Sequence, residues 1–220
     1  MKKLIFLFLV LPLSISAQNS SMEKSGNSIS QLNADPSIVD VTFKSGVENQ
    51  ELQTYYQFEN IDQTEFFIKG DAIKGKYYVL RMKEFLNGEL IKTSTLLDER
   101  GNEYFKQDTS ALSLKLFTKI GKDDIKVWLR NSKMGSKQSY FPTNNDNGRY
   151  VAKNFFGAKD LLKEDASDSF YIMSVITPNR NPDGSGSYCR VAQSEIAPEQ
   201  FGNEFKIPHY YLIEIEFMKE

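Results

Sequence analysis

The amino-acid sequence predicts an all-β protein with one short helix, folded as an antiparallel two-sheet sandwich, a jelly-roll-like arrangement or a barrel. Two observations carry this expectation. After Pro36, short runs rich in Val, Ile, Phe, Tyr and Thr alternate with clusters of Gly, Asn, Asp and Pro, as strands alternate with turns. There are roughly eight to ten such runs, and no repeat or second linker divides them. We therefore expect a single β-sandwich domain over residues 37–220.

The first 17 residues have the pattern of a secretory signal peptide. A charged start at residues 1–3 precedes an apolar run over Leu4–Leu11, and small residues follow at Ser14, Ser16 and Ala17. The apolar run is shorter than the roughly 20 residues that span a bilayer as a helix. No cysteine follows it to carry a lipid. We expect cleavage after Ser16 or Ala17, a periplasmic or secreted protein without a lipid anchor, and no stable membrane insertion afterwards.

Residues 18–36 follow the signal sequence and are rich in Ser, Asn, Gln and Gly, with only scattered apolar residues. Such a composition buries too little apolar surface to repay the entropy of ordering the chain. We interpret this segment as a flexible N-terminal tether, with a frayed chain end as the alternative.

The first strand is expected around residues 39–43, where Val39, Val41 and Phe43 alternate with polar residues. Residues 52–58 and 65–69 are the next candidates. Residues 76–97 predict a long hairpin that turns at Asn87-Gly88, a dipeptide suited to tight hairpin turns.

The register of this hairpin favours a bulge. A two-residue turn places Lys83 opposite Lys92, which is a repulsive pair. One extra residue instead places Glu84 opposite Lys92 and Phe85 opposite Ile91. Because these pairs attract, we expect the extra residue.

Four further elements complete the prediction. A second hairpin joins residues 112–116 to 125–129, and a third joins residues 170–177 to 188–196 through the turn at 181–184. Residues 210–218 form a final long strand. Only residues 157–164 resemble a helix, and that helix is short.

The chain carries 27 basic and 29 acidic residues spread along its length, for a formal net charge of -2. A nucleic-acid-binding protein needs a clustered basic face to displace counterions from phosphates. No run of basic residues forms such a cluster, so we expect no nucleic-acid partner.

The chain has one histidine, His209, and one cysteine, Cys189. Catalytic zinc usually takes two or three histidines or several cysteines, so we expect no metal site and no cofactor. If the last two strands pair, the two residues lie roughly 23 Å apart, too far for a catalytic dyad. Cys189 is expected in the core, and His209 at the surface or a sheet edge.

Aromatic doublets recur along the chain, among them Tyr55-Tyr56, Tyr77-Tyr78 and Tyr210-Tyr211. Successive strand side chains point to opposite faces, so one ring of each doublet on a strand faces outward. Outward rings offer a stacking surface, and we take Tyr55, Tyr77 and Tyr210 as candidate ligand-binding residues. The alternative is that other segments of the chain cover these rings.

Export, strand content and the absence of catalytic motifs together predict a non-catalytic binding or assembly module of the bacterial cell envelope. Its partner would be a glycan or another envelope protein. One alternative is an exported hydrolase that cleaves polysaccharide through paired carboxylates such as Asp123, Asp124 or Asp146. Another is a structural subunit that docks by strand addition, with residues 210–218 as the strand.

Overall fold

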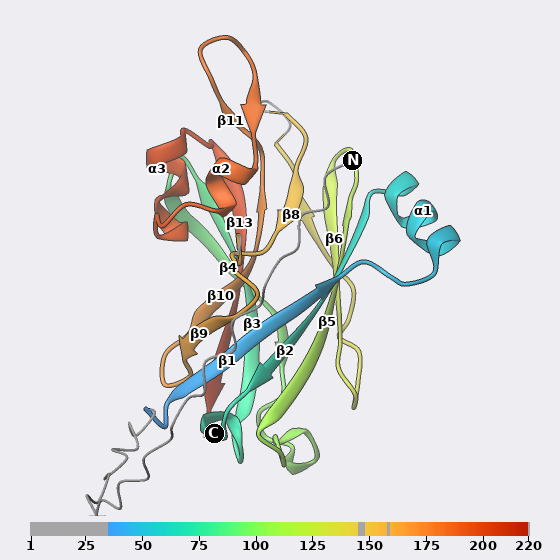
Figure 1. The fold of residues 1–220 in the computed structure, drawn as a ribbon, viewed down its shortest axis with the longest axis vertical. Coiled ribbons are helices and arrows are strands. Elements are labelled where there is room, and N and C mark those ends of the chain that lie inside the picture. The colour runs from blue at the N-terminus through green and yellow to red at the C-terminus, as the bar shows by residue number, and fades with distance from the viewer. Residues whose placement is uncertain (1–34, 145–147, 158, 220) are drawn as a thin grey trace, which may run out of the picture. The chain divides into compact units, whose positions relative to one another are not determined.

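The computed structural model describes residues 35–144, 148–157 and 159–219. The predicted signal peptide, nearly all of the predicted tether and Asp146 lie outside these residues. Two large antiparallel sheets pack together (Figure 1), which confirms the all-β sandwich among the predicted folds. None of the helices in the described ranges combines the length and the apolar character that crossing a membrane requires.

The larger sheet has six strands in the spatial order β7-β6-β5-β2-β1-β9. The bounds of its strands are β1 (Ile38–Ser45), β2 (Ile61–Lys69), β5 (Ala111–Ile120), β6 (Asp124–Arg130), β7 (Ser139–Pro142) and β9 (Leu162–Asp165).

The smaller sheet has five strands in the order β4-β3-β13-β10-β8, and a two-stranded ribbon, β11-β12, stands apart from both sheets. The bounds are β3 (Tyr77–Leu86), β4 (Glu89–Asp98), β8 (Val151–Lys153), β10 (Phe170–Ile176), β11 (Asn179–Arg180), β12 (Gly186–Ser187) and β13 (His209–Met218).

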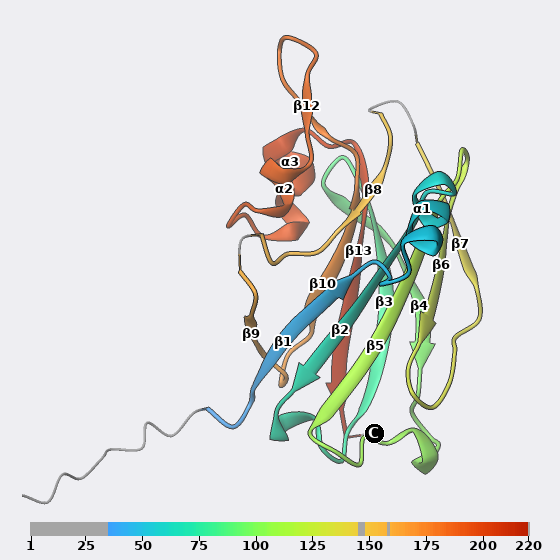
Figure 2. The ribbon, with the colours of Figure 1, turned by 45° about the vertical axis from the view of Figure 1, so that its right-hand side comes forward.

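Short helical segments connect the strands. The α-helices are α1 (Gln50–Phe58), α2 (Cys189–Ala192) and α3 (Phe201–Phe205), and the 3₁₀ turns are η1 (Asp71–Ile73), η2 (Glu103–Phe105) and η4 (Pro198–Gln200). In both ribbon views α1 lies at one side of the sandwich, and α2 and α3 lie at the other (Figures 1 and 2).

Apolar side chains form two cores. The main core lies between the sheets, where alternate residues of each strand meet, for example Phe66 and Leu114 from one sheet with Leu80 and Ile213 from the other. A second core lies on the outer face of the five-stranded sheet, beneath α2 and α3. Its fully or nearly fully buried members are Phe85, Ile176, Val191, Phe201, Phe205, Ile207, Tyr210 and Leu212.

The hairpin at Asn87-Gly88 is confirmed, and so is its bulge. Glu84 pairs with Lys92 as expected, but Phe85 pairs with Leu90, so Ile91 is the extra residue. The hairpin of β5 and β6 and the final strand β13 are also confirmed.

Three element predictions are wrong. Residues 52–58 belong to the helix α1, whose first turn is capped because the Asn49 side chain accepts a hydrogen bond from the Leu52 amide. The predicted helix at 157–164 is replaced by β9, which begins at Leu162 and pairs with β1. Residues 188–196 do not pair with β10, because β13 and β8 take its two edges.

Candidate ligand-binding site

Two of the three predicted ligand-binding residues are buried. Tyr77 points away from the sheet interior, yet it is only 3% exposed because the loop around Glu103 covers it. Its hydroxyl donates to Glu103 Oε1 at 2.9 Å, and the Lys106 ammonium lies 5.4 Å from its ring centroid. Neither face of this ring is open to a ligand, so its burial argues against the predicted stacking role of Tyr77.

Tyr210 also points outward from β13, and the second core covers it. Its ring stacks on Phe85 with centroids 4.8 Å apart, and its hydroxyl donates to the Glu199 carbonyl at 2.6 Å. Burial raises the pKa of Tyr210 to about 12. Tyr210 therefore packs in the second core, and its burial argues against the predicted ligand role. The third candidate, Tyr55 on α1, is 55% exposed.

The structure places a different aromatic pair on an open sheet face. Phe117 of β5 and Trp128 of β6 are cross-strand partners, with ring centroids 5.1 Å apart and planes inclined by 31°. Both rings are partly exposed on the outer face of the six-stranded sheet. With Tyr56 and Ile61 they line a pocket of about 200 Å³, whose polar rim comes from Lys119, Lys126 and Gln138.

Strand alternation explains why these rings face outward. Leu116 and Thr118 of β5, and Val127 and Leu129 of β6, are buried on the inner face. The residues between them must therefore point to the other side of the sheet. The aromatic pair is a direct consequence of the two-residue period.

The loop after β6 fixes the orientation of the Trp128 ring. The indole Nε1 donates to the Ser136 carbonyl at 3.0 Å, and the Ser136 hydroxyl accepts from the Leu129 amide at 3.1 Å. A Cβ atom on Gly135 would lie only 3.2 Å from Trp128 Cζ2, so glycine lets the loop approach the ring closely. A ring held in this way loses little conformational freedom when a ligand stacks on it.

Helix α1 borders the aromatic face and adds further exposed rings. Tyr56 lines the pocket, while Tyr55 and Phe58 face solvent, the latter with 80% of its surface exposed. An ion pair between Glu59, the residue after α1, and Lys119 joins the end of the helix to β5. On the opposite border, Lys126 lies 5.8 Å from the ring centroid of exposed Tyr140.

Phe117 and Trp128 do not form a doublet in the sequence, so the doublet pattern does not predict them. A different pattern in the sequence marks their positions. The segments Lys-Leu-Phe-Thr-Lys at residues 115–119 and Lys-Val-Trp-Leu-Arg at 126–130 each centre one aromatic residue between apolar and basic neighbours. Because strand side chains alternate between two faces, the apolar residues and Thr118 of these segments point inward. Their outward face carries one basic residue, one aromatic residue and a second basic residue.

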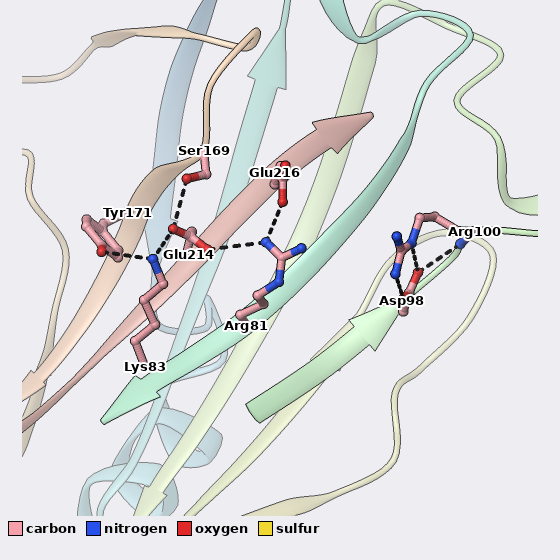
Figure 3. A network of polar contacts seen from close by, with 8 residues as sticks. All are labelled: Arg81, Lys83, Asp98, Arg100, Ser169, Tyr171, Glu214 and Glu216. Carbon is pink, nitrogen blue, oxygen red and sulfur yellow. Dashed lines mark hydrogen bonds and ion pairs between the residues drawn. The ribbon is translucent and has the colours of Figure 1, made fainter. Parts of the chain in front are cut away.

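Two carboxylates on β13 lie side by side on the outer face of the five-stranded sheet. Figure 3 shows Arg81 and Lys83 reaching across from β3 to Glu214 and Glu216. Arg81 lies 2.5 Å from Glu216 and 3.3 Å from Glu214, and Lys83 lies 2.5 Å from Glu214. Ser169 donates a further hydrogen bond to Glu214. Both acids are engaged by cations, which is typical of a structural ion-pair network.

A pocket at one end of the sandwich also holds two carboxylates, Asp98 and Glu103. Arg100 binds Asp98 with two guanidinium nitrogens and holds the pKa of that carboxyl below its usual value. The Tyr77 hydroxyl and then Lys106 lower the pKa of Glu103 in the same way. A glycosidase needs one carboxyl with a raised pKa as its general acid, so this pair does not favour hydrolysis.

His209 is buried on a central strand, so the prediction of a surface or edge position is wrong. Its Nδ1 lies 2.6 Å from the Tyr150 hydroxyl, and its Nε2 lies 3.0 Å from Glu84 Oε1. Glu84 also accepts a hydrogen bond from Tyr211. Because both ring nitrogens have partners in the core, the histidine has none left to activate Cys189 as a nucleophile.

Cys189 is exposed at the start of α2, which corrects its predicted core position. It lines a pocket of about 380 Å³ between the two sheets, together with Asp62 and Lys153. Burial raises the pKa of Asp62, while Thr64 donates a hydrogen bond to it and Lys153 attracts its charged form. This pocket combines one acid, one base and a thiol without a histidine near enough to complete a catalytic set.

Within residues 35–144, 148–157 and 159–219, no group of three or more His, Cys, Asp or Glu side chains is placed to hold a metal ion. Comparison of the chain with protein-family models, with curated proteins and with solved structures finds no match.

Proposed function

We propose that the protein is a non-catalytic binding module of the cell envelope that holds a glycan on the outer face of its six-stranded sheet. The observation that carries this proposal is the Phe117–Trp128 pair, two adjacent and partly exposed rings on one face of the sheet. Sugar rings present apolar C–H faces that stack on aromatic rings and hydroxyl edges that hydrogen-bond to polar side chains. Lys119, Lys126 and Gln138 supply such polar groups around the rings.

The size of the pocket fits one sugar residue of a longer chain. At about 200 Å³ it is smaller than the roughly 300–1,000 Å³ that encloses a drug-sized ligand. The neighbouring face continues past Tyr140 on one border and α1 on the other, so a chain can extend over the sheet in either direction.

Export supports a ligand of the envelope, because the predicted signal peptide directs the chain across the inner membrane.

Strand addition through β13 is less favoured, since β3 and β10 occupy both edges of that strand. A protein partner remains the second candidate, and the exposed rings of Tyr55 and Phe58 on α1 favour it.

The test is a screen of the purified protein against soluble glycans, read by fluorescence and by thermal stability. Trp128 is the only tryptophan and lies in the proposed site, so ligand stacking should change its emission directly. A ligand that binds the native state also raises the melting temperature. We expect a saturable change in both signals with one class of glycan.

Changing Phe117→Ala should weaken this binding about two- to twelvefold, since an aromatic pair contact contributes about 0.5–1.5 kcal/mol beyond its buried area. The variant keeps Trp128 as the reporter. Tyr104→Ala is the matched control, because Tyr104 is an exposed ring outside the site. Equal affinities for the wild type and the Phe117→Ala variant would contradict the proposal.

A further inference from the structure

We propose that the glycan held on this face is anionic, a polyuronate whose carboxylates meet the basic residues that flank the aromatic pair. This inference rests on the proposed function and names the class of its ligand. It concerns the outer faces of β5 and β6, where charge and aromatic character are arranged in rows.

The cross-strand register builds three rows on this face. Lys115 lies opposite Arg130, Phe117 opposite Trp128, and Lys119 opposite Lys126. The aromatic row is therefore enclosed between two rows that each contain two cations. We call these six side chains the basic-aromatic face.

Such an arrangement has a cost for folding. Like charges placed directly opposite each other on paired strands destabilise a sheet, and this hairpin has two such pairs. Elsewhere the same protein pairs opposite charges across strands, for example Arg81 with Glu214 and Asp40 with Lys69. A function that uses the positive charge explains why these two rows pair like charges, whereas other cross-strand pairs join opposite charges.

Part of the charge is neutralised within the chain, and part is free for a ligand. Glu65 lies 3.4 Å from Lys115, and Glu59 forms an ion pair with Lys119. No described residue forms an ion pair with Lys126 or Arg130, the two cations of β6. These two side chains stand on either side of Trp128, at alternate positions on the same strand face.

The spacing suits a repeating acidic sugar. Lys126 and Arg130 are four residues apart on one strand, which places their Cα atoms about 13 Å from each other. A sugar stacked on Trp128 therefore has a cation on each side, where the carboxylates of neighbouring uronate residues lie. A neutral glycan would use the rings and leave both cations without an anionic partner.

The test compares oligogalacturonate with a neutral galactose oligosaccharide of equal length, using calorimetry on the full protein at low and at high salt. We expect oligogalacturonate to bind about tenfold or more tightly at low salt, and the preference to shrink at high salt as the charges are screened. The double variant Lys126→Gln, Arg130→Gln should lose most of the preference for oligogalacturonate over the neutral oligosaccharide. Each charge removed should lower the affinity for oligogalacturonate by up to about fivefold.

Lys92→Gln on β4 is the control for loss of a charge outside the site, since it removes one exposed cation from the other sheet. Thermal melting checks that the double variant folds. We expect no loss of stability, because Lys126→Gln relieves its repulsion with Lys119.

The outcomes separate the two proposals. Equal affinity for both oligosaccharides, unchanged in the double variant but weakened in Phe117→Ala, overturns the polyuronate and leaves glycan binding in place. Binding of neither oligosaccharide, nor of any glycan in the wider screen, overturns the proposed function itself. If single-stranded DNA binds as tightly as oligogalacturonate, and Phe117→Ala does not weaken either interaction, the face is a non-specific polyanion surface. That result also overturns the inference.

Discussion

At the scale of single residues, Glu99 is the side chain whose burial has the clearest energetic consequence. It is only 2% exposed, and its Oε2 atom has no hydrogen-bond partner among the described residues. Its other oxygen accepts from the Asn131 amide at 2.8 Å, and the same amide contacts the Tyr78 hydroxyl. Burial raises the pKa of Glu99 to about 7, although Tyr78, Asn131 and then Lys133 favour the charged form.

The raised pKa predicts that the protein loses stability as the pH rises. A carboxyl group whose pKa is about 4.5 unfolded and about 7 folded stabilises the fold fully below pH 4.5 and loses that contribution as the pH passes 7. The difference of about 2.5 units corresponds to at most about 3 kcal/mol. Glu99→Gln stays neutral, so we expect its free energy of unfolding to exceed that of the wild type at pH 8.

Urea denaturation of both proteins at pH 5 and pH 8 measures this effect. Asp62 and Glu164 also have pKa values raised by burial, so the wild type and the variant share their contribution and only the difference reports Glu99. Glu103→Gln is the control, because the pKa of that carboxyl is lowered, so its removal cannot reproduce the loss of stability with rising pH that is expected for Glu99. If the free energy of unfolding has the same pH dependence in the wild type and in the Glu99→Gln variant, burial does not raise the pKa of Glu99, and the prediction fails.

At the scale of elements, local pattern predicted the strands well and their partners less well. The Asn87-Gly88 turn and the alternation of β5 and β6 are encoded in neighbouring residues, and both hairpins were predicted from them. The sequence of α1 favours a strand locally, because Thr54, Tyr55, Tyr56 and Phe58 are strand formers, although Asn49 supplies a helix N-cap. The pairing of β10 with β13 joins segments some 40 positions apart, which no local pattern specifies.

The same distinction applies to the candidate site. That Tyr77 and Tyr210 point outward follows from strand alternation, and this part of the prediction agrees with the structure. That Glu103 and Glu199 lie over them depends on how the connecting segments fold back, 26 residues from Tyr77 and 11 residues from Tyr210. Phe117 and Trp128 stay partly exposed because no segment among the described residues covers them completely, and only the three-dimensional structure could show this.

The contact between α3 and the β3–β4 hairpin gives a prediction at this scale. A Cβ atom on Gly202 would lie 2.4 Å from the Gly88 amide nitrogen, so the helix packs directly on the backbone of the turn. Gly202→Ala must push α3 away from the sheet, and we expect a loss of about 1–3 kcal/mol in the free energy of unfolding. Glu204→Ala, at an exposed position of the same helix, should change stability little, and chemical denaturation compares the two.

At the scale of the whole molecule, the fold combines a rigid centre with one lightly attached element beside the site. Strand β13 is paired on both edges and covered on both faces, by the main core and by the second core. Helix α1 has no buried residue. Local stability follows buried contacts, so α1 should open far more often than β13.

This difference predicts how ligand binding changes hydrogen exchange. In the free protein, the amides of α1 should exchange faster than those of β5, β6 and β13. A glycan that stacks on Trp128 and Phe117 also touches Tyr56, which lines the same pocket, so binding should slow exchange in α1 while β13 stays unchanged. Mass spectrometry of the free and saturated protein tests this. Slower exchange confined to α2 and α3 would place the ligand on the other sheet, because those helices cover the five-stranded sheet and lie away from the basic-aromatic face.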